Sequence, residues 1–288
     1  MPVDPELAAL LAREAASGLP PRSERSVALT RALYAQSSRA LGGPLATVPV
    51  RQPSPRIRVY GESAEAAVVF FHGGRFFSGD LETHDPLCRS LAAQSGCAIA
   101  AVDNRLAPEH RWPTPLRDAL DAAAWVRKRW PHVAIAGDSA GANLAAVAAF
   151  IRPRDFACQL LVYPMLDATC SLPSHREFAA GYGPGSEDMR RGWREYVPSR
   201  QDPTRPTISP LFAASLANLP PAWVLTAEYD CLRDEGEAYA QRLAAAGTPT
   251  VLRRYNGAIH GFAQMEGISS LARRAVSEAA AWLRASLL

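Results

Sequence analysis

A serine with the surroundings of a nucleophile lies near the middle of the chain. Residues 137–141 read GDSAG, so Ser139 stands between Gly137 and Gly141 in a G-x-S-x-G motif. An apolar run that fits a strand precedes the motif, and a run that fits a helix follows it. Such a sharp turn exposes the serine oxygen at the carboxyl edge of a sheet, where it can attack an acyl carbonyl. The alternative is a glycine-rich turn with an incidental serine, and the flanking pattern favours the nucleophile.

A serine hydroxyl is a weak nucleophile unless a neighbouring base accepts its proton. Of the six histidines, His260 fits best, because it follows the apolar run TVLRRY and precedes the last helical stretch. The acid that orients this base should follow a strand between the two, as Asp230 does after AWVLTAEY. Glu228, Asp234 and Glu235 are rivals. We favour Asp230, because Glu228 falls within the strand end and the others fit the first turn of the next helix.

An acyl-transfer site also needs backbone N–H groups that stabilise the oxyanion of the tetrahedral intermediate. The stretch VVFFHGGRFFSGD, residues 68–80, ends a buried-looking strand in a bare loop. The glycines would let this loop turn its amides toward the substrate. We therefore expect an oxyanion hole from Gly73, Gly74 and Ala140, with a plain connecting loop as the alternative.

Arg75 follows these two glycines and does not need their freedom. A guanidinium is always charged and is poorly accommodated in a dry pocket unless a carboxylate pairs with it. We expect its side chain to turn away from the acyl site, toward an acidic partner or a cap. A freely solvated arginine is the alternative.

The elements that position these residues follow from an alternation of short apolar runs and helix-like stretches after Arg56. The runs are IRVY, AVVFF, CAIAAV, HVAIAG, QLLVY, AWVLTA and TVLRRY. This alternation predicts an α/β fold with a mostly parallel sheet covered by helices on both faces. A final helix is expected over residues 271–287.

Two amphipathic helices are expected before the sheet, over residues 4–17 and 24–39, followed by a linker rich in Gly and Pro over residues 41–55. An aromatic-bearing segment, residues 171–208, interrupts the alternation and is a candidate lid, with a surface excursion as the alternative. We therefore expect N-terminal cap helices in 1–45 and a catalytic domain in 46–288 that carries a cap insertion in 171–208.

Composition limits the other classes of function. The 288 residues carry a net charge of +3 without a basic block, which disfavours nucleic-acid binding. The apolar runs are shorter than the ~20 residues that span a bilayer, and the first residues do not resemble a signal peptide. Five cysteines without C-x-x-C fit a reducing compartment. We expect a cytoplasmic protein without membrane partner, metal or nucleotide cofactor, and leave a homodimer open.

Taken together, seven motifs in this order resemble the hormone-sensitive-lipase family of α/β-hydrolase esterases. They are HGGRF (72–76), DNRLAPEH (103–110), GDSAG (137–141), YPMLD (163–167), SPL (209–211), DCLRDE (230–235) and HGF (260–262). The resemblance implies an eight-stranded sheet, an N-terminal cap and metal-free hydrolysis of short acyl esters. It also implies the triad Ser139, Asp230 and His260 and the oxyanion hole Gly73, Gly74 and Ala140.

The sequence departs from the pattern of this family at two positions. Arg75 stands where many relatives have a third glycine, and Cys231 stands where proline is common in the acid motif. A backbone donor at position 75 survives the first change, whereas the shape of the pocket is put in doubt. In the DNRLAPEH motif we expect Asp103, Arg105 and Glu109 to tie the sheet edge to the oxyanion loop by charge-assisted hydrogen bonds.

The sequence thus predicts a serine carboxylesterase that hydrolyses short- to medium-chain acyl esters through an acyl-enzyme. The same triad would serve an amidase or deacetylase, and the sequence does not distinguish these. A small-molecule receptor on the same scaffold is a third reading, which the presence of His260 disfavours.

Overall fold

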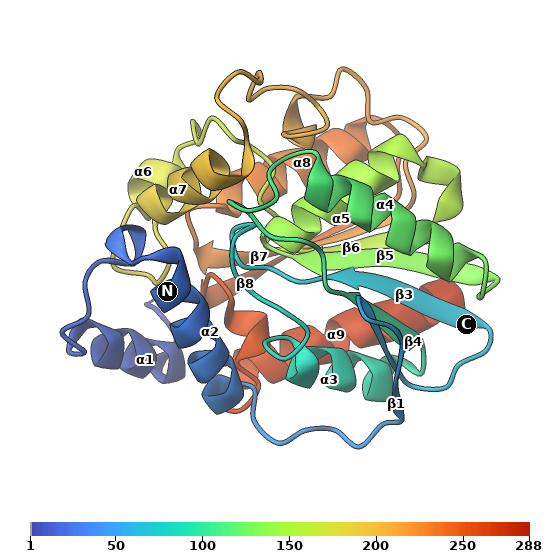
Figure 1. Ribbon diagram of the computed structural model, residues 1–288, viewed down its shortest axis with the longest axis horizontal. Helices are drawn as coiled ribbons and strands as arrows, with labels where there is room; N and C mark the ends of the chain where they lie inside the picture. Colours follow the sequence, from blue (N-terminus) through green and yellow to red (C-terminus); the bar gives the residue numbers. More distant parts are fainter. Residues whose placement is uncertain (1) are drawn as a thin grey trace.

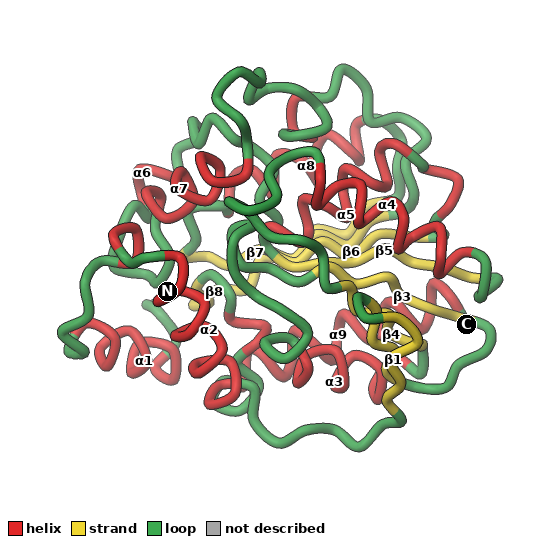
Figure 2. The backbone as a smooth tube through the Cα atoms, viewed as in Figure 1, coloured by secondary structure: helices red, strands yellow, loops and turns green. Residues whose placement is uncertain are grey.

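The computed structural model describes residues 2–288, which form an eight-stranded sheet between two layers of helices (Figures 1 and 2). The strand order is β1-β2-β4-β3-β5-β6-β7-β8. The first two strands pair antiparallel with their neighbours, and all other pairs are parallel, which confirms the predicted mostly parallel sheet. The strands are β1 (Val50–Ser54), β2 (Ile57–Tyr60), β3 (Ala66–Phe71), β4 (Ala98–Val102), β5 (His132–Asp138), β6 (Cys158–Val162), β7 (Ala222–Tyr229) and β8 (Thr250–Ile259).

Helices cover both faces of the sheet, because the central strands are apolar along their whole length. All six residues of β3 and all five of β4 are buried. The helices α3 (Asp85–Ser95) and α9 (Ser270–Leu287) pack on one face, and α4 (Thr114–Arg127), α5 (Ala140–Ile151) and α8 (Arg233–Ala245) pack on the other (Figure 1). Each face has its own buried apolar cluster.

The predicted linker over residues 41–55 is wrong in part, since it contains β1. This strand lies at the sheet edge, its residues are largely exposed, and Pro53 interrupts it. Proline is tolerated on an edge strand because the missing N–H need not pair inside the sheet. The strand therefore lacks the buried apolar pattern that marks the strands from β2 to β7.

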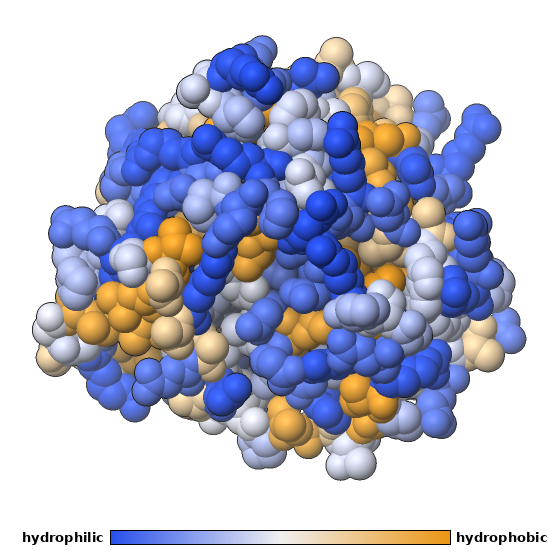
Figure 3. Space-filling view, viewed as in Figure 1, coloured by the Kyte–Doolittle hydropathy of each residue, from blue (hydrophilic) through white to orange (hydrophobic). Residues whose placement is uncertain are grey.

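The two expected N-terminal helices are α1 (Pro5–Ala15) and α2 (Val27–Leu41). Asp4 caps α1 by accepting from the N–H of Glu6 at 3.0 Å, and Ser26 caps α2 by accepting from the N–H of Leu29 at 3.1 Å. In Figure 1 both helices lie at the same end of the molecule as β7 and β8, and Figure 3 shows apolar side chains gathered over them. Within residues 2–288, no helix has the length and apolar character needed to cross a membrane.

The insertion after β6 contributes α6 (Ser174–Glu177) and α7 (Ser186–Tyr196), which lie near α2 (Figure 1). The Arg191 guanidinium of α7 donates to the backbone carbonyls of Arg22 at 3.4 Å and Ser23 at 3.2 Å. The N-terminal segment and the insertion therefore contact each other. We propose that residues 1–45 and 171–208 together form a cap over the catalytic domain 46–288.

The turn between β5 and α5, which carries Ser139, packs closely against the end of β3. A side-chain carbon at Gly141, in the first turn of α5, would collide with the backbone carbonyl of Phe71 at the end of β3. Only glycine permits this close approach, which brings the start of α5 over the loop that follows β3.

We predict that Gly141→Ala lowers the free energy of unfolding by about 3 kcal/mol or more, because backbone on both sides must move. Gly18→Ala is the control: Gly18 has a φ of +67° and open space around it, so backbone strain alone costs about 1 kcal/mol. Urea unfolding followed by circular dichroism measures both. Equal losses in the two variants would contradict the packing argument.

Candidate active site

Ser139 occupies the turn between β5 and α5 with a φ of 54° and a ψ of −118°. Few residues other than glycine adopt such a φ, and those that do are often at functional positions. The side chain is buried at the start of α5, beside a cavity of about 580 Å³. The strand–turn–helix context that the motif required is therefore present.

The structure brings the three predicted residues of the triad into one chain of hydrogen bonds. Ser139 Oγ lies 3.0 Å from His260 Nε2, and His260 Nδ1 lies 2.7 Å from Asp230 Oδ2. The other oxygen of Asp230 accepts from the N–H of Leu232 at 2.8 Å, which fixes the carboxylate plane. All three side chains are buried, so water does not compete strongly for these bonds.

The three rival acids have other partners. Glu228 accepts from the N–H of Gly257 at 2.7 Å, and Asp234 accepts from the N–H of Ser174 at 2.8 Å. Glu235 is fully buried against His175, 3.1 Å away, and burial raises its pKa to about 7. Asp230 is thus the acid that contacts His260.

The oxyanion loop requires one correction. The N–H of Gly73 already donates to Asp138 Oδ1 at 2.7 Å, so the prediction of Gly73 as an oxyanion donor is wrong. Within residues 2–288, the N–H groups of Gly74, Arg75 and Ala140 donate to no protein acceptor. Gly74 has a φ of +121°, and a side chain there would collide with the Ser78 carbonyl.

Asp138, next to the nucleophile, joins several parts of the site. Besides the Gly73 N–H, its carboxylate contacts His84 Nε2 at 3.0 Å and Gln264 Nε2 at 2.9 Å. The Tyr34 hydroxyl of α2 in turn lies 3.1 Å from Gln264 Oε1. Burial alone would raise the pKa of Asp138, but His84 and the Gly73 N–H outweigh it and hold that pKa below its usual value.

Sequence reasoning did not find this group of residues. Tyr34, His84 and Gln264 come from three distant parts of the chain, and none belongs to a pattern that predicts a contact with Asp138. No predicted strand ends directly before His84, so its position in the sequence gives no sign of a role in the site. The one available signal was that Asp138 directly precedes the nucleophile.

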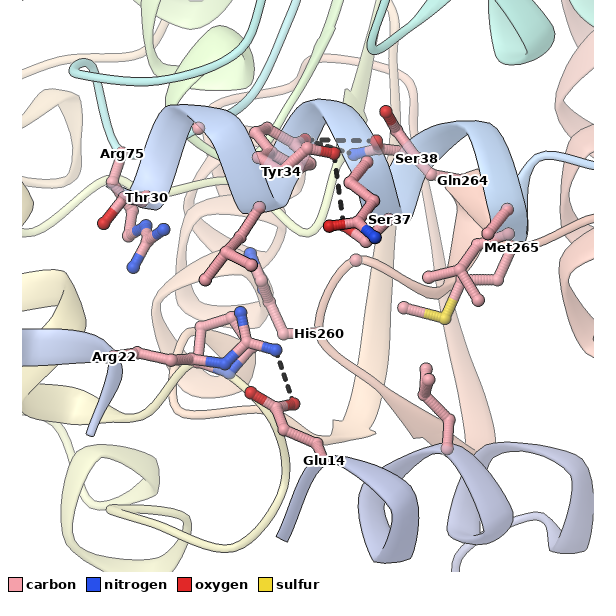
Figure 4. A pocket seen from close by; sticks show the side chains of 18 of the residues that line it. Glu14, Arg22, Thr30, Tyr34, Ser37, Ser38, Arg75, His260, Gln264 and Met265 are labelled. Atoms are coloured by element: carbon pink, nitrogen blue, oxygen red, sulfur yellow. Dashed lines mark hydrogen bonds and ion pairs between the residues drawn. The ribbon is translucent and has the colours of Figure 1, made fainter. Parts of the chain in front are cut away.

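The N-terminal segment lines much of the cavity beside Ser139: in Figure 4, α2 lies on one side, α1 lies on the opposite side, and His260 lies between them. Ser139 and Gly74 also line this cavity. The apolar part of the lining comes from leucines and methionines: Leu10, Leu19, Leu33, Leu41, Met189 and Met265. The cavity can therefore hold an acyl chain next to the serine oxygen.

The expectation for Arg75 is half right. Its acidic partner is Asp188 of α7, with 3.5 Å between Nη1 and Oδ1. However, the side chain does not leave the site, since Arg75 lines the same cavity as Ser139 (Figure 4). Burial lowers the pKa of the guanidinium to about 10, and Asp188 opposes this effect.

The charged residues of the DNRLAPEH motif make different contacts from those expected. Arg105 pairs with Asp118 of α4 at 2.6 Å, and Glu109 pairs with Arg31 of α2 at 2.7 Å. Arg31 also donates to the carbonyls of Phe77 at 2.8 Å and Ala107 at 3.0 Å. Glu109 therefore holds the cap helix through Arg31, which itself contacts the oxyanion loop.

In the part of the chain that the structure describes, no three His, Cys, Asp or Glu side chains are arranged to hold a metal ion.

An eight-stranded sheet with a serine on the turn after β5 and a histidine after β8 defines the class of the α/β hydrolases. A family model for the α/β hydrolase fold matches residues 68–264. The chain belongs to this family, in the branch related to hormone-sensitive lipase, as its motifs predicted.

Three named proteins illustrate the similarity. Carboxylic ester hydrolase LipN of Mycobacterium tuberculosis is 36% identical over 86% of this chain and 69% of its own. A hyperthermophilic esterase from the archaeon Pyrobaculum calidifontis is 40% identical, with a TM-score of 0.89 over 99% of both chains. A thermostable esterase from Pseudomonas putida is 31% identical, with a TM-score of 0.94 over 100% of this chain and 98% of that one.

We predict that Asp138→Asn lowers kcat for a neutral ester about tenfold to a hundredfold, because a charged acceptor that orients the oxyanion loop is lost. Asp138 has a lowered pKa, so its stabilising effect is present above pH 3.8 and is lost as the pH falls through the folded-state pKa. The free energy of unfolding of the Asp138→Asn variant should therefore fall less between neutral and acidic pH than that of the parent protein.

The control is Asp118→Asn, which removes a carboxylate that is paired with Arg105 and lies outside the cavity. Steady-state kinetics and acid unfolding are measured for both variants. If Asp138→Asn keeps kcat within twofold of the parent, the carboxylate does not orient the loop.

Proposed function

We propose that this carboxylic ester hydrolase cleaves short- and medium-chain acyl esters through a Ser139–His260–Asp230 triad and an acyl-enzyme. The observation that carries the proposal is the unbroken chain of contacts from Ser139 Oγ to His260, at 3.0 Å, and from His260 to Asp230, at 2.7 Å. The esterase names of the relatives support the reaction type. We further propose a small-molecule ester as the partner and a cytoplasmic site of action.

The first half of the reaction forms the acyl-enzyme. Asp230 accepts from His260 Nδ1–H, which leaves Nε2 free to take the proton of Ser139. The serine oxygen forms a bond to the acyl carbon, and the carbonyl electrons move to the oxygen. When that carbonyl reforms, the bond to the alcohol breaks, and His260 gives its proton to the leaving alkoxide. Water then repeats the sequence on the acyl-enzyme and releases the carboxylic acid.

The developing oxyanion is stabilised by the N–H groups of Gly74, Arg75 and Ala140. These three amides have no other protein acceptor within residues 2–288, and two of them lie on the loop that Asp138 anchors through Gly73. Donors fixed before the reaction starts stabilise charge without reorganising, and one such donor contributes about 10²–10³ in kcat.

We predict that Ser139→Ala loses covalent labelling by an organophosphonate and about 10⁴-fold or more of the esterase activity, because triad members act as a unit. Ser37→Ala is the control, since Ser37 supplies another hydroxyl to the same cavity. It should keep the label. Mass spectrometry of the intact protein measures the adduct, and a full adduct on the Ser139→Ala protein would exclude Ser139 as the nucleophile.

We also predict that kcat/KM peaks for acyl chains of roughly two to eight carbons. The cavity has a volume of about 580 Å³, so its capacity is limited, while each methylene that fits contributes about 0.8 kcal/mol or less. A series of p-nitrophenyl esters from two to sixteen carbons measures the profile. A preference for sixteen carbons, or strong activation at a lipid interface, would contradict this reading.

A further inference from the structure

Arg75 is a buried cation that faces the reaction cavity with unused hydrogen-bonding capacity. The residue is 8% exposed, and its Nη1 has no hydrogen-bond partner within residues 2–288. Asp188 Oδ1, at 3.5 Å, likewise makes no hydrogen bond in this part of the chain. The pair therefore balances charge but leaves these two atoms without a hydrogen bond, and such buried, unpaired polar atoms are costly.

The surroundings of Arg75 carry more positive than negative charge. Arg22 and Arg25 share a single carboxylate, that of Glu14, at 2.5 Å and 3.7 Å respectively. Arg191 is paired only loosely, with Glu195 at 3.7 Å. Among the charged side chains that line the cavity, Arg13, Arg22, Arg25 and Arg75 are positive, whereas Glu14 and Asp138 are negative.

The geometry also directs this charge toward a ligand in the cavity. Figure 4 shows the guanidinium groups of Arg75 and Arg22 extending into the space beside His260. Arg75 lies over the ring of Phe77, with 5.0 Å from Cζ to the ring centroid. The ring limits its movement, so a rigid donor is held at a fixed position relative to Ser139.

We propose that the cavity contains a carboxylate subsite formed by Arg75 with support from Arg22, and that the enzyme prefers esters bearing a carboxylate. The planar guanidinium matches a carboxylate in shape and charge, and the buried setting strengthens the bond. This inference rests on the proposed function, since it names the class of ester that reaches Ser139.

The test compares anionic and neutral esters of matched length. On the acyl side, monomethyl succinate, glutarate and adipate are compared with methyl butyrate, pentanoate and hexanoate. On the alcohol side, 3-acetoxypropanoate is compared with propyl acetate. The readout is the ratio of kcat/KM for the anionic ester to that for its neutral match, and the series with the larger ratio shows which part of the substrate meets Arg75.

We expect Arg75→Gln to lower this ratio by about tenfold to a hundredfold, the range for a hydrogen bond to a charged group. Asp188→Asn should leave the ratio unchanged or raise it, because the competing carboxylate is gone. Arg13→Gln is the matched control. Arg13 also lines the cavity, but it is exposed, so screening should hold the change below twofold.

Arg75→Gln leaves Asp188 buried without a counterion, so Arg75→Gln/Asp188→Asn is made in parallel as a charge-balanced variant. Binding of monomethyl adipate and methyl hexanoate to the Ser139→Ala protein, with and without Arg75→Gln, is measured by calorimetry. This arm separates the two proposals, because it reports the subsite even if the triad assignment fails. A ratio that stays within twofold in both ester series, with equal binding of the two ligands, would overturn the carboxylate subsite.

Discussion

One buried carboxylate, that of Asp138, holds the active site together. It receives the N–H of Gly73 from the oxyanion loop, the ring of His84 from the start of α3, and the amide of Gln264 from the segment after His260. These groups come from parts of the chain that no strand pairing joins. Asp138 directly precedes Ser139. A shift of the loop or of the segment after His260 would therefore move Asp138 and change the position of Ser139.

The same carboxylate explains why Gly73 and Gly74 differ. Gly73 uses its amide to fix the loop, and this leaves the following amides free to face the cavity. A charged acceptor is suited to this task, since a hydrogen bond to a carboxylate is stronger than one between neutral groups. The contact between the Gly73 N–H and Asp138 therefore fixes the loop in advance, although neither group touches the reacting atoms.

The residues that the strand ends bring together could be predicted from the sequence. Contacts that depend on the direction of a single N–H group could not. Ser139, Asp230 and His260 each follow a parallel strand, so their meeting at one sheet edge follows from topology. No residue pattern tells which of two adjacent glycine amides faces a carboxylate. The strand β1 was not predicted for a different reason: an exposed edge strand has no buried apolar face that the sequence pattern could show.

The cavity lining combines parts of the chain that lie far apart in the sequence. Most of the lining residues lie between Leu10 and Leu41, whereas the members of the proposed triad follow β5, β7 and β8. A chimera that exchanged α1 and α2 with those of a relative would therefore alter substrate range while keeping the chemistry. Such an exchange would also have to preserve the contacts through which α2 meets the rest of the chain, which include Tyr34 with Gln264 and Arg31 with Glu109.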